Sequence, residues 1–205
     1  ADHMVENVIG LYELPFGIAT NFRINHQDYL IPMVVEEPSV IAAASNAAKM
    51  FRDGGGFGTS SSDPIMIGQM QILDVPDLVT AVERLKSHQD QLLERMNSIG
   101  GSIITRGGGA KGIETRILKD TAVGDMLILH ILYDTRDAMG ANAVNTAVEL
   151  IAEDITELTG GRVHLKILSN LADQRTARAE GVIPRSTLAT DSMSGEEVVD
   201  AVLEA

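Results

Sequence analysis

Two adjacent carboxylates stand directly before a predicted helix. Glu36 and Glu37 are followed by Pro38 and Ser39, and an Ala-rich segment comes next. At a helix N-terminus the helix dipole stabilises ionised carboxylates, so such an arrangement usually only caps a helix. A carboxyl group can instead donate a proton near neutral pH when burial or a neighbouring charge raises its pKa. From the residue types alone we favour capping and keep Glu37 as a candidate acid.

A turn from a predicted strand into a predicted helix could bind an anion. Residues 134–142 form the sequence D-T-R-D-A-M-G-A-N. The free N–H groups of a helix start point outward, and Gly140 would let a ligand approach the backbone closely. Arg136 could pair with a phosphate, and Asn142 could present its amide. An ordinary strand-to-helix turn capped by Asp137 is the alternative, and the residues alone favour it.

A glycine-rich segment at residues 107–112 matches the pattern G-x-G-x-x-G. In Rossmann folds this pattern opens a helix, whose N-terminus stabilises the phosphates of a dinucleotide. Here the glycines lead into a predicted strand, so we favour a flexible loop. A Walker A phosphate loop is excluded, because Gly112 follows Lys111 where that motif needs Ser or Thr.

The sequence offers no metal site. Its five histidines lack metal-ligand spacing such as H-x-x-x-H, and it contains no Cys. Disulfides and thiol nucleophiles are therefore excluded too. His130, inside an apolar segment, is expected to be a core or edge histidine.

Composition excludes several classes of partner. The chain of 205 residues has 16 Lys and Arg against 29 Asp and Glu, a formal charge of -13 that repels nucleic acids and anionic membrane surfaces. No apolar run is long enough for a membrane span, and the first residues lack the pattern of a signal peptide. With 44% hydrophobic residues, a folded, soluble, cytoplasmic protein is expected.

Apolar periodicity predicts the elements that must position these residues. A helix is expected at 38–53 and a loop at 58–64. Beyond the loop, strands are expected at 65–74, 113–118, 126–133 and 163–168, and helices at 78–96 and 141–158. The order βαββαβ is that of the split βαβ, or ferredoxin-like, arrangement, with two helices on one face of a four-stranded antiparallel sheet.

The predicted fold class is therefore α+β, with a ferredoxin-like subdomain inserted in part of a larger, helix-rich domain. We expect the larger domain at residues 1–62, the small domain at 63–169, and a return to the larger domain at 170–205. Near the end, Ser194 and Glu197 form a capping box that opens an amphipathic helix. That helix shows no stop signal, and we expect the chain to be a fragment of a longer protein.

Four short motifs together resemble one enzyme family. They are E-N-V-I-G at residues 6–10, V-E-E-P-S at 35–39, D-A-M-G-A-N at 137–142 and L-S-N-L-A-D at 168–173. In this order they resemble the class II 3-hydroxy-3-methylglutaryl-CoA (HMG-CoA) reductases, from about Val5 to Ala205. The resemblance favours functional roles for Glu37 and for residues 137–142 over the capping interpretations.

The resemblance implies an oxidoreductase that interconverts HMG-CoA and mevalonate by two successive hydride transfers with NAD(P)H, and no metal. In this family the large domain binds the CoA thioester, and the small ferredoxin-like domain binds the dinucleotide. Each active site is assembled across the interface of a homodimer or higher homo-oligomer. Overall similarity to the degradative members favours NAD weakly over NADP.

The matching motifs also imply roles for individual residues. By this resemblance Glu37 is the catalytic glutamate and Ser39 contacts the hydroxymethylglutaryl group. The dinucleotide would be bordered by Asp137, Met139, Gly140 and Asn142, with Asn170 near the nicotinamide.

Three catalytic motifs of the family do not occur in this sequence. They carry a Lys in H-N-K-G, an Asp in G-N-D and a His on a C-terminal flap, so the 205-residue chain is expected to be inactive alone. Two alternatives remain: a non-catalytic ferredoxin-like ligand-binding module, and a Rossmann dehydrogenase with parallel strands at the glycines.

Overall fold

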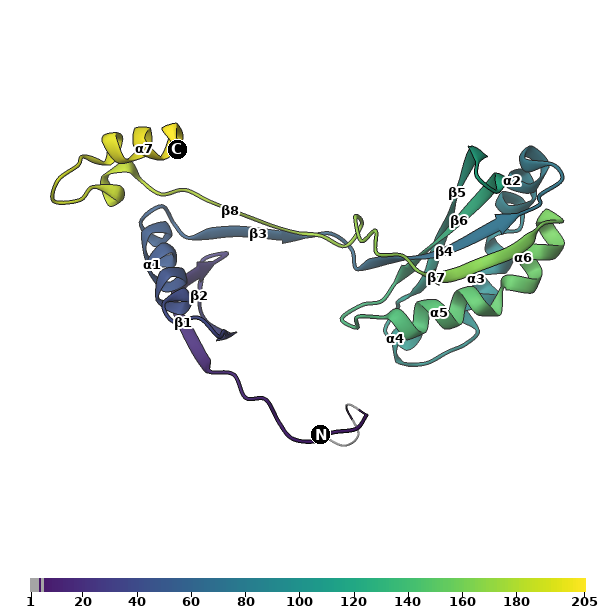
Figure 1. Ribbon diagram of the computed structural model, residues 1–205, viewed down its shortest axis with the longest axis horizontal. Helices are drawn as coiled ribbons and strands as arrows, with labels where there is room; N and C mark the ends of the chain where they lie inside the picture. Colours follow the sequence, from purple (N-terminus) through teal and green to yellow (C-terminus); the bar gives the residue numbers. More distant parts are fainter. Residues whose placement is uncertain (1–3, 5) are drawn as a thin grey trace. The chain divides into compact units, whose positions relative to one another are not determined.

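The computed structural model describes residue 4 and residues 6–205, which form two compact units (Figure 1). Unit 1 comprises residues 1–60 and 178–205, and unit 2 comprises residues 61–177. Each unit combines a four-stranded β-sheet with helices. The α+β class predicted from the sequence is therefore confirmed.

The sheet of unit 2 is antiparallel throughout. Its strands are β4 (Ile65–Leu73), β5 (Gly109–Thr121), β6 (Gly124–Asp134) and β7 (Arg162–Leu168). They lie in the order β5-β6-β4-β7, with Gly68 of β4 opposite Ile131 of β6 and Leu168 of β7. A parallel Rossmann sheet is therefore excluded for unit 2. The predicted glycine-to-strand transition is found, because β5 begins within the glycine-rich segment.

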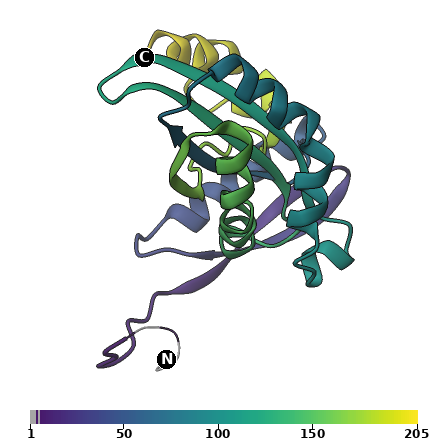
Figure 2. The ribbon, with the colours of Figure 1, turned by 90° about the vertical axis from the view of Figure 1, so that its right-hand side faces the viewer.

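Five helices accompany this sheet. They are α2 (Leu78–Ser87), α3 (Gln89–Asn97), the short α4 (Ser102–Thr105), α5 (Ala141–Leu150) and α6 (Ala152–Thr159). The pairs α2–α3 and α5–α6 lie on one face of the sheet (Figure 2). Alternate residues of β6 face them and form an aliphatic core, in which the fully buried side chains include Met70, Leu85, Met96, Leu129, Ile131, Val144, Val148 and Ile155.

Two predicted helices are each divided in the structure. The helix expected at 78–96 breaks at His88, where the Ser87 hydroxyl and His88 Nδ1 lie 2.9 and 2.8 Å from the Arg84 carbonyl oxygen. These side chains compete with the helix for that acceptor. The helix expected at 141–158 breaks at the fully buried Ile151, where ψ is 2°.

Helix α5 is held closely against the sheet. A Cβ at Gly68 would lie 2.5 Å from Val148 Cγ1 and 3.0 Å from Val144 Cγ1, so only glycine permits this approach of β4 and α5. From the same helix, Asn145 Oδ1 accepts a hydrogen bond from the Leu168 amide at 2.8 Å. The N-terminus of α5 is therefore fixed relative to both β4 and β7.

Unit 1 differs from the sequence prediction. Its sheet has the order β2-β1-β3-β8, from the strands β1 (Phe16–Ile24), β2 (Gln27–Val34), β3 (Phe57–Ser61) and β8 (Ala177–Gly181). No sequence pattern indicated β1, β2 or β8, and the loop predicted at 58–64 was wrong where β3 forms. The described residues of unit 1 are therefore mixed α and β, and the expectation of a helix-rich structure there was wrong. Local periodicity missed β3 and β8 because they are short, polar and paired across more than half of the chain.

The helices of unit 1 agree better with the sequence. They are α1 (Val40–Asp53), the 3-10 helix η1 (Arg185–Leu188) and α7 (Gly195–Glu204). Helix α1 ends at Gly54 as predicted, and the capping box of α7 is confirmed. There the Ser194 amide donates to Glu197 Oε2 at 2.7 Å, and the hydrogen bonds to Ser194 lower the pKa of Glu197. Among the described residues, every helix is too short or too polar to cross a bilayer.

Candidate functional site

The turn between β6 and α5 presents an uncapped helix N-terminus. Gly140 is the N-cap residue of α5, with a left-handed backbone (φ 86°), and no side chain caps the first turn. Asp137 is exposed and does not cap the helix, so the capping interpretation of this residue was wrong. The first N–H groups of α5 are therefore available to an anion.

Position 140 has no room for a side chain. A Cβ there would lie 2.7 Å from Thr135 Cβ and closer still to Thr135 Cγ2. Thr135 is fully buried, and its amide donates to the Pro64 carbonyl oxygen at 3.1 Å. The turn is thus packed against the start of β4, and glycine meets both the steric and the conformational requirement.

One residue that the sequence analysis missed holds this turn. Arg175 Nη1 donates to Thr135 Oγ1 and to the Ala138 carbonyl oxygen, each at 2.9 Å. No local pattern marks Arg175, because its partners lie about 40 positions earlier in the sequence.

Two of the cavities measure about 580 and 350 Å³, and the larger one lies beside this turn. The larger cavity lies entirely within unit 2. It is lined by Ser61, Ser62, Pro64, Arg136, Asp137, Arg175, Thr176 and Ala177. Two guanidinium groups and one carboxylate therefore line a cavity beside the turn that leads into α5.

Arg136 has a more structural role than the sequence suggested. Its Nη2 donates to the Gly107 carbonyl oxygen at 2.6 Å and lies 3.5 Å from Asp134 Oδ2. Its backbone is left-handed (φ 52°), and its amide donates to Asp134 Oδ1 at 2.9 Å. Arg136 therefore ties the glycine-rich segment to the turn, and it contributes positive charge to the cavity.

The glycine-rich segment permits a close backbone contact and opens no helix. A Cβ at Gly108 would lie 2.6 Å from the Asp134 carbonyl oxygen, so this glycine lets the segment pass directly against the end of β6. Gly112 is different, because a Cβ there would have only Leu132 Cδ1 as a neighbour, at 3.8 Å.

The remaining candidates of unit 2 are exposed. Met139 exposes 71% of its surface on the turn, and Asn142 is exposed on the first turn of α5. Asn170 is exposed in the segment after β7, where its carbonyl oxygen accepts a hydrogen bond from the Ala172 amide. The structure thus gathers Asp137, Met139, Gly140 and Asn142 at one strand–helix junction.

Glu37 and Ser39 lie in unit 1, in the turn that precedes α1. Both are exposed, and the Ser39 backbone is left-handed (φ 75°). Ser39 is the N-cap residue of α1, but its side chain makes no capping hydrogen bond. In the part of the chain that the structure describes, Glu37 makes no hydrogen bond or ion pair. The side-chain capping suggested by the sequence is therefore absent here.

His130 is the notable buried titratable group. It exposes only 4% of its surface in β6, and its Nδ1 has no hydrogen-bond partner among the described residues. Burial lowers the pKa of His130, the charge of Arg116 lowers it further, and Glu114 and Asp173 oppose this effect. His130 is buried as predicted, but its ring is not fully satisfied.

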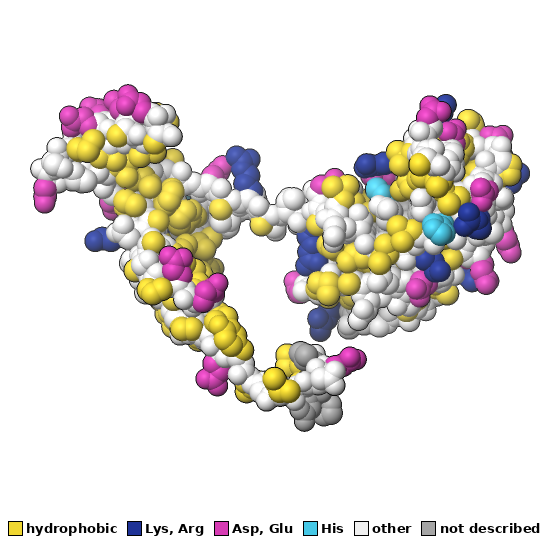
Figure 3. Space-filling view, viewed as in Figure 1, with side chains coloured by type: hydrophobic (Ala, Val, Ile, Leu, Met, Phe, Trp, Pro, Cys, Tyr) yellow, Lys and Arg dark blue, Asp and Glu magenta, His cyan; other side chains and the backbone are white. Residues whose placement is uncertain are grey.

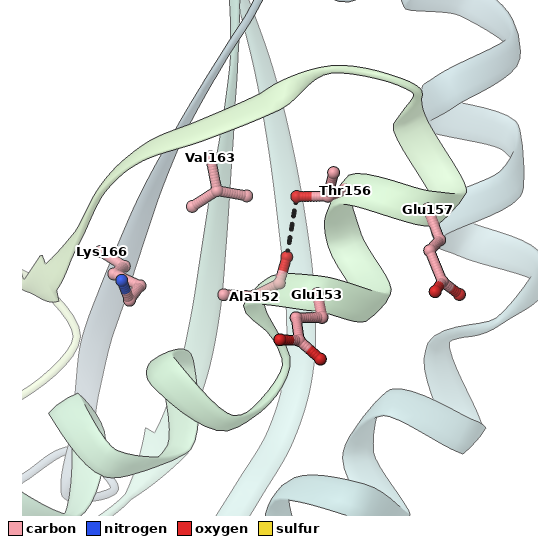
Figure 4. Close-up of a pocket in the computed structure, with 6 residues that line it drawn as sticks. All are labelled: Ala152, Glu153, Thr156, Glu157, Val163 and Lys166. Carbon is pink, nitrogen blue, oxygen red and sulfur yellow. Dashed lines mark hydrogen bonds between the residues drawn. The ribbon is translucent and has the colours of Figure 1, made fainter.

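The cavity of about 350 Å³ lies between α6 and β7 (Figure 4). It is lined by Ala152, Glu153, Thr156, Glu157, Val163 and Lys166. The Thr156 hydroxyl donates to the Ala152 carbonyl oxygen at 3.0 Å, as an internal bond of α6. None of the residues singled out by the sequence lines it, and no cluster of metal-ligating side chains occurs among the residues described.

Comparison with known proteins relates this site to one family. The whole chain, residues 1–205, matches the family model described as hydroxymethylglutaryl-coenzyme A reductase. The chain is 50% identical to 3-hydroxy-3-methylglutaryl-coenzyme A reductase of Archaeoglobus fulgidus over 203 residues, which are 99% of this chain and 45% of that protein. It is 36% identical to the probable reductase of Borreliella burgdorferi over 185 residues, 88% of this chain and 40% of that protein.

A solved structure is similar as well. The class II 3-hydroxy-3-methylglutaryl-CoA reductase from Streptococcus pneumoniae, bound to NADPH in open conformations, matches with a TM-score of 0.91 at 36% identity. The match covers 97% of this chain and 53% of that chain. This chain therefore spans about half the length of the relatives that it matches.

Proposed function

The chain belongs to the hydroxymethylglutaryl-coenzyme A reductase family, and we propose that the full-length protein interconverts HMG-CoA and mevalonate with a nicotinamide dinucleotide. The observation that carries this proposal is the family match over all 205 residues, together with 50% identity to a reductase over 99% of the chain. A non-catalytic ligand-binding module is not favoured, because the similarity extends through both units.

We assign dinucleotide binding to a ferredoxin-like small domain at residues 63–169. Residues 1–62 and 170–205 would then belong to the large, substrate-binding domain. The strand order β5-β6-β4-β7 supports this assignment, as does the position of one helix pair after β4 and another after β6.

The junction of β6 and α5 fits a dinucleotide. Uncapped N–H groups and the charge of Arg136 would stabilise a pyrophosphate, and Gly140 lets a ligand approach the backbone. Asp137, Met139, Gly140 and Asn142 would border the dinucleotide, with Asn170 near the nicotinamide. When bound, the cofactor supplies the hydride, and the chain's own residues bind and orient it.

Glu37 is proposed as the proton donor, and Ser39 as a contact of the hydroxymethylglutaryl group. Reduction of a thioester places negative charge on the carbonyl oxygen, so the reaction needs a cation at that oxygen and a proton donor. Glu37 can supply only the proton. The family's Lys motif does not occur in these 205 residues, so we propose the activity for the longer protein and expect this chain alone to be inactive.

We propose that the protein acts as a homodimer or higher homo-oligomer. Apolar side chains gather over part of unit 1 (Figure 3), and burial in an interface would remove them from water. The exposed apolar residues of this unit include Leu11, Tyr12, Phe16, Leu30, Val202 and Leu203.

Steady-state kinetics of the full-length protein tests the function. We expect HMG-CoA to cause oxidation of NAD(P)H, and mevalonate with CoA to cause the reverse reaction. Absence of both reactions in a folded protein would refute the proposal. For the cofactor we propose NAD, and a higher kcat/KM with NADPH than with NADH would contradict that choice.

A further inference from the structure

The Arg175 side chain is hydrogen-bonded to three residues of the turn that leads into α5. Its Nη1 donates to Thr135 Oγ1 and to the Ala138 carbonyl oxygen at 2.9 Å, and its Nη2 lies 3.4 Å from the Arg136 carbonyl oxygen. The planar guanidinium can direct several donors at once, which a single ammonium group cannot do in the same geometry. One side chain therefore binds the turn at residues 135, 136 and 138.

The turn needs such a support because its backbone is unusual. Arg136 has φ 52°, in the left-handed region that costs free energy for a residue with a Cβ, and Gly140 has φ 86°. Among the described residues, one backbone hydrogen bond lies within this turn. The Ala138 amide donates it to the Thr135 carbonyl oxygen at 3.1 Å. Loss of the guanidinium would leave the Ala138 and Arg136 carbonyl groups without their side-chain partner.

The backbone that carries Arg175 is itself held in place. The Ser62 hydroxyl donates to the Gln174 carbonyl oxygen at 2.9 Å and accepts from the Thr176 amide at 2.8 Å. The Ser62 amide donates to the Thr176 carbonyl oxygen at 3.0 Å. Both neighbours of Arg175 are therefore bonded to Ser62, and the guanidinium starts from a defined position.

We propose that Arg175 is the positioning residue of the dinucleotide site. Its guanidinium holds residues 135–138 in the conformation that directs Asp137 and Met139 outward and aligns Gly140 with the N-terminus of α5. This inference rests on the proposed function. It states that Arg175 gives the proposed dinucleotide site its shape before the cofactor binds. Arg175 acts through the turn, and direct contact with the cofactor is not required.

Dinucleotide binding by the full-length protein tests the role. NADH and NADPH are titrated separately into wild type, Arg175→Ala and Arg175→Lys, and their fluorescence is followed. Arg178→Ala is the matched control, because Arg178 is an exposed arginine whose bond to Glu180 involves no residue of the turn. Loss of charge-assisted hydrogen bonds should raise the Kd of the alanine variant about 10- to 100-fold, with the Kd for HMG-CoA changed less than about twofold.

Two further readouts separate positioning from charge and from a purely structural effect. In the absence of cofactor, the amides of residues 136–143 should exchange with deuterium faster in Arg175→Ala, and added guanidinium ion should reverse both that change and the loss of affinity. Arg175→Lys keeps the positive charge, so the variant should remain folded. Lysine lacks the planar guanidinium, however, so dinucleotide should bind several-fold more weakly than to wild type.

The opposite results overturn the inference. A lysine variant with wild-type affinity would mean that charge alone suffices, and an unchanged exchange rate in Arg175→Ala would mean that Arg175 does not hold the turn. Wild-type protein that binds neither NADH nor NADPH would refute the proposed function, and this inference with it. Wild-type binding together with unaltered binding by Arg175→Ala would refute the inference alone.

Discussion

The turn between β6 and α5 requires glycine at position 140. The space beside Gly140 is filled by the buried Thr135, and the backbone lies in the left-handed region. Asp137 and Arg175 can contribute to the proposed dinucleotide site only if this turn keeps its conformation.

Gly140→Ala in the full-length protein should weaken dinucleotide binding about tenfold, because the added Cβ meets Thr135 and alanine disfavours the left-handed region. Fluorescence titration with NADH and NADPH measures the change. Gly112→Ala, in the glycine-rich segment, has room for the new Cβ and should bind normally. If the Gly112 variant loses affinity and the Gly140 variant does not, the site has been assigned to the wrong glycines.

Glu37→Gln should lower turnover of the full-length protein by about 100-fold or more, because the amide keeps the shape of the side chain but cannot deliver a proton. The fold and the Kd for HMG-CoA should be retained. Glu36→Gln is the matched control, since it removes the neighbouring carboxylate and should leave kcat nearly unchanged. Normal turnover by the Glu37 variant would show that another group donates the proton.

At the scale of elements, the contact between β4 and α5 connects the sheet to the site. Gly68 faces Val144 and Val148 with no space for a methyl group. The Asn145 side chain of α5 accepts a hydrogen bond from the amide of Leu168, the last residue of β7. A change in the sheet should therefore be transmitted to the N-terminus of α5. Strand β6 adds a second feature, the buried His130.

Gly68→Ala should destabilise the protein by about 1 to 3 kcal/mol, because overpacking forces β4 and α5 apart. Urea unfolding of the full-length protein, followed by circular dichroism, gives the free-energy change. Gly112→Ala in the same sheet should change stability much less. Equal effects of the two substitutions would mean that the close packing at Gly68 does not limit the separation of these elements.

His130 should make stability depend on pH. Burial lowers the pKa of His130 in the folded chain below its ordinary value of 6.5, so the unfolded chain binds more protons between the two values. Stability should therefore be highest above about pH 6.5 and fall as the pH decreases through that window. Thermal midpoints between pH 5 and 8 measure this dependence.

The corresponding variant isolates the His130 contribution. His130→Gln removes the titrating ring, so the fall in midpoint below pH 6.5 should become shallower than in wild type. His164→Gln, which changes an exposed histidine on β7, should retain the wild-type dependence. A wild-type slope in the His130 variant would assign the pH dependence to other groups.

For the whole protein, two of the proposed functional residues belong to different units. Glu37 lies in unit 1 and Gly140 in unit 2, and the proposed homo-oligomer would contain an interface between subunits. The exposed apolar side chains of unit 1 fit such an interface. Whether the two residues act within one subunit or between subunits can be decided by mixing defective proteins.

Subunit mixing should restore activity if Glu37 and Gly140 of one active site come from different subunits. Full-length Glu37→Gln and Gly140→Val proteins are each expected to be nearly inactive. After random exchange into dimers, about a quarter of all sites would combine an intact Glu37 with an intact Gly140. Recovery near that fraction of wild-type kcat supports the shared site, whereas no recovery after verified exchange would place both residues in the same subunit.

Features that depend on neighbouring residues could be predicted from the sequence. The alternation of apolar residues located β4, β5, β6 and β7, and the Ser194–Glu197 pair predicted the capping box of α7. Four short motifs were enough to indicate the family. These inferences succeed because side-chain periodicity and capping are local properties of the chain. The functional roles of all the site residues remain predictions: Glu37, Ser39, Asp137, Met139, Gly140, Asn142 and Asn170.

Features that depend on residues far apart in the sequence could be seen only in the three-dimensional fold. The polar strands β3 and β8 form because they pair with each other, and Arg175 reaches the turn at Thr135 from 40 positions away in the sequence. Gly140, and not Asp137, is the N-cap residue of α5, so the Asp137 carboxylate does not cap this helix. Long-range pairing and side-chain contacts of this kind arise when the chain closes on itself, so no local pattern records them.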